Sequence, residues 1–102
     1  MKAYVGVFTA RLETPWARSL KEKRAVIKPV MERIKARFPV SAARLDGLNE
    51  HGWERVGFSV IGAEAEWVSG VLDAVERFLA GSGEYRLVVL EREVFVFDEP
   101  PE

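Results

Sequence analysis

The sequence predicts one α+β domain whose elements follow the order strand, helix, strand, strand, helix, strand. Two segments carry apolar residues at helical spacing, and each lies between segments rich in strand-forming residues. At 102 residues the chain is long enough for one domain with a modest core and short for two. A hydrophobic fraction of 48% and a charged fraction of 30% are typical of a globular protein.

The first strand is predicted over Lys2 to Leu12, where Val, Tyr, Phe and Thr predominate. Thr14-Pro15 ends it, because proline cannot donate a hydrogen bond to a neighbouring strand. Residues 16–18 then form the connection to the first helix.

The first helix is predicted from Ser19 to Phe38. Ser19 followed by Glu22 is a capping box, in which side chains take up backbone N–H groups at the helix start. Pro29 removes one helical hydrogen bond, and we expect a continuous helix that is kinked there. Pro39 ends the helix. The apolar residues that recur at helical spacing form one stripe: Leu20, Ile27, Val30, Met31, Ile34 and Phe38.

Seven cations flank this apolar stripe, so the helix combines a buried face with a strongly basic one. At about 100° per residue, these cations fall on two different flanks of the apolar stripe. The first flank carries Lys21, Arg24, Lys28 and Lys35, and the second carries Lys23, Arg33 and Arg37.

The middle of the chain predicts two strands joined by a turn. Residues 40–46 form a weak, alanine-rich strand that suits a sheet edge. Residues 47–52 form the turn. Residues 53–61 alternate well, with Val56, Phe58 and Val60 on one face.

The second helix is predicted from Glu64 to Ala80, with Gly81 as its stop signal. Its outer face is acidic and carries Glu66, Asp73 and Glu76. A last strand follows over residues 87–97, broken or bulged around residues 91–93. Residues 98–102 are expected to form a loose acidic tail, so that the domain itself spans residues 1–97.

This order predicts a ferredoxin-like βαββαβ sandwich: a four-stranded antiparallel sheet with both helices on one face. The other face would then be open. Tyr4 and Phe8 share one face of the first strand, whereas Val5 and Val7 share the other. Apolar residues on both faces indicate that the open face is partly covered, and self-association is the commonest way to cover it.

Charge is segregated along the chain. Between Arg11 and Arg44, ten Lys or Arg residues accompany three Glu residues, a net of +7. From Leu45 onward, four Arg residues accompany thirteen Asp or Glu residues, a net of −9. This distribution indicates a molecule with a basic side and an acidic side.

Composition excludes several classes of protein and site. With no cysteine, disulfides and thiolate metal sites are impossible. His51 is the only histidine, and we expect no metal site, no cofactor and no catalytic group. No apolar run suits a membrane span and no secretory signal is visible, so a cytoplasmic location is expected. Few thermolabile residues and abundant charge are typical of a thermophile.

The segment Ala17-Arg18-Ser19-Leu20-Lys21-Glu22-Lys23-Arg24 resembles the SLKEKR signature of the small YlxP-like bacterial proteins. That family has no known function. The resemblance implies a ferredoxin-like fold, and it implies no catalytic residues. Family members are often encoded among transcription and translation factors, which favours a connection to RNA or the ribosome. Pro39 departs from the pattern, since relatives usually carry Asn there.

Three functions follow as hypotheses. A basic helix neutralises phosphates, so the first is docking on RNA or a ribosomal particle. The second is a homodimer or other interaction module, formed through the open sheet face or through a sheet edge, with Tyr4, Phe8 and Trp53 as the candidate interface residues. The third is a regulatory domain that binds a small ligand between paired sheets. A merely solvated basic face competes with the first hypothesis. The predicted RNA contacts are Arg18, Lys21, Lys23, Arg24, Lys28, Lys35 and Arg37.

Overall fold

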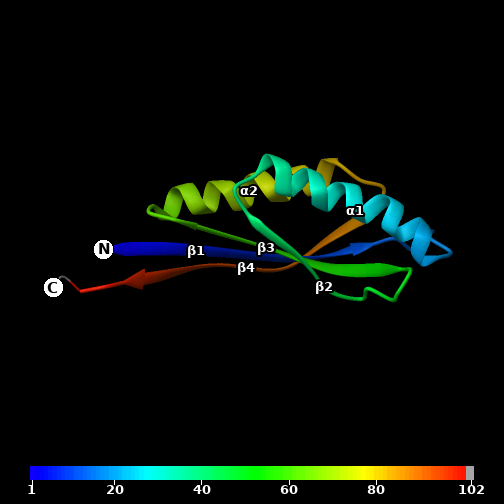
Figure 1. Ribbon diagram of the computed structural model, residues 1–102, viewed down its shortest axis with the longest axis horizontal. Coiled ribbons are helices and arrows are strands. Elements are labelled where there is room, and N and C mark those ends of the chain that lie inside the picture. Colours follow the sequence, from blue (N-terminus) through cyan, green and yellow to red (C-terminus); the bar gives the residue numbers. More distant parts are fainter. Residues whose placement is uncertain (101–102) are drawn as a thin grey trace.

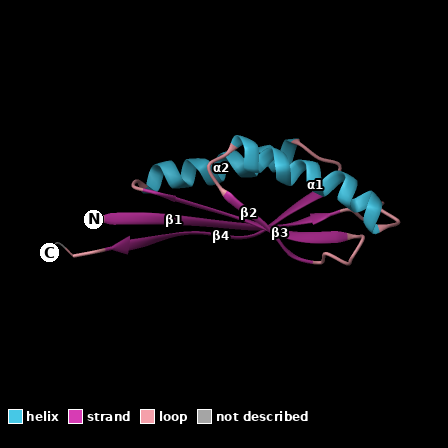
Figure 2. Cartoon of the chain, in the orientation of Figure 1, coloured by secondary structure: helices cyan, strands magenta, loops and turns pink. Residues whose placement is uncertain are grey.

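One antiparallel sheet with strand order β2-β3-β1-β4 carries both helices on the same face (Figures 1 and 2). The computed structural model describes residues 1–100. The predicted ferredoxin-like βαββαβ arrangement is confirmed. The elements are β1 Lys2–Glu13, α1 Leu20–Arg37, β2 Ser41–Asp46, β3 Trp53–Gly62, α2 Ala65–Gly81 and β4 Arg86–Asp98.

The core lies between the helices and one face of the sheet. Alternate residues of β1 and β3 point into it, because successive side chains of a strand face opposite sides. α2 lies so close to β1 that a Cβ atom on Gly6 would sit 2.7 Å from Val68 and 2.9 Å from Leu72. Gly6 therefore permits the close approach of α2. The fully buried core side chains include Phe8, Leu12, Ile27, Ile34, Val56, Leu72 and Val75.

Local signals set both ends of α1. The Ser19 hydroxyl accepts a hydrogen bond from the Glu22 N–H at 3.1 Å, as the capping box predicts. Phe38 is extended (φ −119°, ψ 147°), as expected for a residue that precedes a proline. Pro29 is exposed and lies inside α1, which runs from Leu20 to Arg37 without interruption, as predicted. The kink expected at Pro29 stays a prediction.

β4 is one continuous strand, so of the two predicted alternatives, a break or a bulge around residues 91–93, the structure has the bulge, immediately before them. Its pairing with β1 shifts between Thr9 and Ala10, which lie opposite Glu91 and Val89 respectively. Leu90 is thus the extra residue of a β-bulge. Residues an odd number apart normally point to opposite faces of a strand. Because of the bulge, Val89 and Arg92, three residues apart, both lie on the helix side.

β1 and β4 project as a ribbon beyond the helices at the end of the molecule that holds both termini (Figure 1). The molecule accordingly measures 57 × 21 × 19 Å. Asp98 belongs to β4 rather than to a tail, and it lies opposite Lys2. The Glu99 N–H continues the pairing by donating to the Met1 carbonyl at 2.9 Å. The rest of the predicted tail, residues 101–102, lies outside the described residues.

A buried ion network fastens α1 to the sheet. Lys23 Nζ lies 3.1 Å from Glu54 Oε1, and both side chains are fully buried. Arg44 holds the same carboxylate in a bidentate pair, with Nε and Nη2 donating at 2.5 and 2.7 Å. The three residues come from α1, β3 and β2, so one carboxylate joins three elements.

Lys23 also anchors the connection between β2 and β3. Its ammonium donates to the carbonyls of Gly47 at 2.8 Å and Trp53 at 3.3 Å. A lysine ammonium carries three donors, and Glu54 with these carbonyls provides an acceptor for each. The buried charge is therefore paired and hydrogen-bonded, as a charge in a protein interior has to be.

The network keeps Glu54 ionised. Burial by itself would raise the pKa of the Glu54 carboxyl. The hydrogen bonds and charges of Arg44 and Lys23 outweigh burial and hold that pKa below its ordinary value. The hydrogen bond to Glu54 likewise raises the pKa of the Arg44 guanidinium. The charged forms are thus the stable ones at neutral pH.

Replacing Glu54 with Gln should destabilise the protein by about 3–5 kcal/mol at neutral pH, because Lys23 loses its buried counter-ion. The folded-state pKa of Glu54 is lowered, so the unfolded chain binds more protons in acid. The stabilisation from ionised Glu54 is therefore complete above its ordinary pKa of 4.5 and is lost as the pH falls through the lower folded value. Urea unfolding across this range measures both effects.

The matched control for Glu54 is Glu50→Gln in the exposed turn, which should change the free energy of unfolding by at most about 0.5 kcal/mol. The wild-type and Glu54→Gln proteins should become more alike in stability as the pH falls. A constant difference down to about pH 3 would contradict the assignment.

Gly47 is the one described residue that requires the left-handed region, with φ +74°. A Cβ atom there would also meet the Trp53 ring at 2.7 Å. Gly47→Ala should therefore reduce stability by about 1–2 kcal/mol from backbone strain alone, and by more from the contact. Gly52→Ala, where a Cβ atom meets only open space, is the control in the same turn. Equal losses in thermal unfolding would count against this explanation.

Candidate nucleic-acid interface

The outer face of α1, together with the residue before its N-cap, carries a cationic ridge, which we define as Arg18, Lys21, Arg24, Lys28 and Lys35. Lys21, Lys28 and Lys35 recur every seven residues and are exposed, so they lie about 10 Å apart along the helix axis. Arg24 is half-buried on the flank of the same face. Within residues 1–100, no acidic side chain forms an ion pair with the first four members of the ridge.

The prediction that Lys23 contacts RNA is wrong. Its side chain is fully buried under α1 and is committed to Glu54 and to backbone carbonyls. The wheel position of Lys23 belongs to the apolar stripe, next to those of Ile27 and Ile34, rather than to a flank. A cation within an apolar stripe is the signal that pointed to a buried ion pair.

Neighbouring side chains orient the two cations at the end of α1, Lys35 and Arg37. Lys35 pairs with Glu32 one turn earlier at 3.4 Å, which is a weak and exposed contact. The Arg37 guanidinium lies 5.8 Å from the centre of the Phe38 ring and 5.1 Å from that of Phe78. These rings orient Arg37 without neutralising it. It lies on the other flank with exposed Arg33, which the list of predicted contacts omitted.

Acidic side chains of α2 are engaged with β4 instead of with α1. Arg92 Nη1 lies 2.6 Å from Asp73 and 3.8 Å from Glu76, and Nη2 donates to the backbone carbonyl and hydroxyl of Ser69. The acidic face of α2 is therefore partly neutralised by the strand beside it. The ridge on α1 keeps its positive charge.

Only one of the three predicted interface residues lies on the open face of the sheet. Tyr4 and Phe8 were predicted as interface residues, and the structure contradicts this, because Phe8 is fully buried beneath the helices and Tyr4 packs against the same core. Trp53 does lie on the open face and is half-buried. Its role in an interface stays a prediction. Strand alternation alone could not reveal which face of β1 the helices cover, because both faces are apolar.

The open face is divided into a charged half and an apolar half. Near the β2–β3 turn, ion pairs join Arg55 to Glu91 at 3.4 Å and Arg11 to Glu13 at 2.9 Å. Toward the termini, the same face carries Val5 with Phe95 opposite it, and Phe97 beyond. Phe95 and Phe97 are 45% and 61% exposed, which is unusual for phenylalanine. Neither residue was among the predicted site residues.

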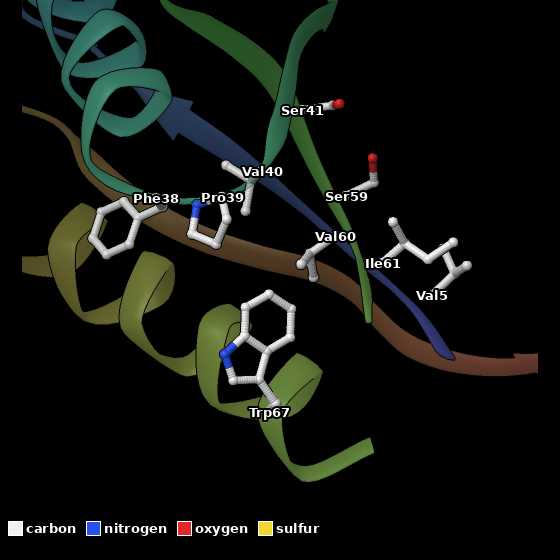
Figure 3. A pocket seen from close by; sticks show the side chains of 9 residues that line it. All are labelled: Val5, Phe38, Pro39, Val40, Ser41, Ser59, Val60, Ile61 and Trp67. Atoms are coloured by element: carbon white, nitrogen blue, oxygen red, sulfur yellow. The ribbon is translucent and has the colours of Figure 1, made fainter. Parts of the chain in front are cut away.

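The surface formed by residues 1–100 has several open hollows of similar size. One, of about 390 Å³, lies at the edge of β3 where β2 has not yet begun. Figure 3 shows Trp67 of α2 on one side of it and Phe38 with Pro39 on the other. Its lining is apolar apart from two serines, so it offers no charged group to a ligand.

A second hollow, of about 460 Å³, lies beside Trp16 and Tyr85. The Trp16 indole N–H donates to the Glu84 carbonyl at 2.8 Å, and the Tyr85 hydroxyl donates to the Leu79 carbonyl. Burial raises the pKa of Tyr85 to about 12, so its hydroxyl stays protonated at neutral pH. Tyr85 therefore serves as a structural donor here rather than as a base.

Among the described residues, no three His, Cys, Asp or Glu side chains gather where they could hold a metal ion. His51 instead makes a 2.8 Å contact from Nδ1 to the Ala17 carbonyl, in the loop before α1. Neither helix of the described chain is long and apolar enough to cross a membrane.

The comparisons with known proteins give a family but no activity. No curated protein matches the chain. A family described as "Protein of unknown function (DUF503)" matches residues 5–92, which cover the chain from the start of β1 to the middle of β4. The matched region includes the cationic ridge and the whole buried network of Lys23, Arg44 and Glu54. The chain therefore belongs to this DUF503 family of proteins of unknown function.

Proposed function

We propose that this protein is a non-enzymatic cytoplasmic protein that docks on structured RNA, such as that of a ribosomal particle, through the cationic ridge of α1. One observation carries the proposal: Lys21, Arg24 and Lys28 are accessible and have no ionic partner among residues 1–100. The other cations of the molecule are mostly engaged. Arg44, Arg55 and Arg92 each hold an acidic side chain.

A row of cations whose only ion pair, among the described residues, is the exposed one between Lys35 and Glu32 suits a phosphate backbone better than it suits a small anion. The ridge is about 21 Å long from Lys21 to Lys35, which exceeds the size of a single phosphate. Lysine contacts with phosphates position a protein without reading base sequence. Binding should therefore depend on the shape and charge of the RNA and fall steeply with salt.

The fold supplies a rigid mount for the ridge. Lys23 lies two residues after Lys21 and holds the first turns of α1 against the sheet through Glu54. Side chains on the opposite side of the same helix are therefore presented in a fixed orientation. Less conformational freedom is then lost on binding, which favours affinity.

RNA is favoured over an acidic protein partner by resemblance. The ridge begins within the segment Arg18 to Arg24 that resembles the signature of the YlxP-like proteins. That resemblance implies a connection to transcription and translation. Assignment to the YlxP-like group is itself part of this proposal.

Replacing Lys21, Arg24 and Lys28 together with Gln should weaken binding to structured RNA, because three phosphate contacts are lost. The slope of log K against log salt concentration should become shallower by up to about three. Binding of the intact protein to ribosomal RNA and co-sedimentation with ribosomal particles, each at several salt concentrations, measure the effect.

The control replaces Lys2, Arg77 and Arg86 with Gln. These exposed cations lie outside α1, so the variant has the same net charge and an intact ridge. It should retain both the affinity and the salt slope of the wild-type protein. Equal losses in the two variants would assign binding to net charge, and undiminished binding by the ridge variant would refute the proposal.

A further inference from the structure

The outer edge of β4 is an apolar strand edge without a neighbour. β4 is the last strand in the order β2-β3-β1-β4, so only one of its sides is hydrogen-bonded within the chain. Its residues 94–97 are Val-Phe-Val-Phe, with Val94 and Val96 on the helix side and Phe95 and Phe97 on the open face. Their exposed fractions run from 40% to 61%.

Along residues 94–97 this edge lacks the features that keep natural strand edges apart. Such edges are usually short, or are interrupted by proline or lysine, or are covered by a helix or loop. β4 has 13 residues, contains neither proline nor lysine, and is exposed along residues 93–98. Its one bulge, at Leu90, leaves the segment from Arg92 to Asp98 regular. An edge of this kind accepts another strand.

We propose that the partner is a second copy of this chain, paired antiparallel through β4 about a two-fold axis at Phe95. The order of residues in the strand is complementary to itself in this register. Val94 lies opposite the second copy's Val96, and Arg92 lies opposite the second copy's Asp98. The two halves of a two-fold interface repeat every contact, so each pairing occurs twice.

The charges favour this register over those centred on Arg92 or Glu93, although Glu91 then lies opposite the second copy's Glu99, just beyond the end of β4. With the axis at Arg92, that residue would face its own copy, and Glu91 would face Glu93. With the axis at Glu93, two glutamates would meet. Like charges directly opposite one another destabilise a sheet, whereas opposite charges stabilise it. With the axis at Phe95, a row across the sheet reads Lys2, Asp98 and the second copy's Arg92, in alternating sign.

The arrangement buries what is otherwise exposed and is compatible with the positions of the helices. A two-fold axis perpendicular to the sheet keeps all four helices on one face of an eight-stranded sheet. On the other face, the two Phe95 side chains meet beside Val5 of each copy. α1 contacts β2 and α2 rather than β4, so both cationic ridges stay outside the interface.

The absence of cysteine permits a direct test of the register. Directly opposite residues of an antiparallel pair have Cα atoms about 4.5–5.5 Å apart, within the range of a disulfide. Phe95→Cys should therefore give a covalent dimer when oxidised with diamide, which takes up the two thiol hydrogens. In Phe97→Cys the two cysteines would be four positions out of register, about 14 Å apart, and should stay monomeric on a denaturing gel.

Solution mass provides the second measurement. The wild-type protein should sediment at twice its 11.5 kDa mass, with dissociation on dilution. Phe95→Lys places two ammonium groups together at the axis and should give the monomer mass. Ile61→Lys, an equally radical change of a residue that is 67% exposed on β3, should leave the dimer intact. Circular dichroism spectra and melting curves verify that both variants are folded.

A wild-type protein that remains at 11.5 kDa throughout the accessible concentration range would overturn the inference. So would a dimer that survives Phe95→Lys, or one that cross-links through position 97 and not through position 95. The ridge variant that replaces Lys21, Arg24 and Lys28 should dimerise normally. Failure of RNA binding and failure of dimerisation are thus told apart.

Discussion

The placement of one lysine charge inside the protein constrains the rest of the structure. Lys23 cannot be buried unless Glu54 meets it, and Glu54 in turn is held by Arg44. These residues come from three elements, so pairing fixes α1 relative to the β2–β3 hairpin. The orientation of the exposed cations on α1 follows, because a helix that presents Lys23 inward presents Lys21 and Lys28 outward.

The element order and most helix and strand boundaries could be predicted because they depend on local patterns. Ser19 starts α1, the proline after Phe38 ends it, and alternation marks β3. Features that depend on tertiary packing were harder to predict from the sequence. The alternation in β1 was predicted correctly, but nothing in it showed which face would meet the helices, and Phe8, predicted as an interface residue, lies in the core. The bulge at Leu90 changes which residues of β4 face the helices, and this change is what made the sequence pattern indicate a break or a bulge nearby.

The charges that are segregated along the sequence do not simply form a basic side and an acidic side in the folded protein. Some acidic residues from the second half of the chain neutralise specific cations, as Glu54 does inside and Asp73 does at the surface. The first half retains exposed lysines that these partners do not reach. The ridge and the β4 edge lie on different elements, so the two proposed surfaces can act without competing for the same residues.

The shared carboxylate of Glu54 also restricts how this family can diverge. A change at Glu54 alone leaves the buried charge of Lys23 without its counter-ion. A change at Lys23 alone removes the hydrogen bond from its ammonium to the Gly47 carbonyl in the turn. Members that carry an apolar residue in place of one should therefore have replaced the other as well, with matching volume. Substitutions at positions 23, 44 and 54 should therefore be correlated among relatives, whereas exposed Glu22 beside them should vary independently.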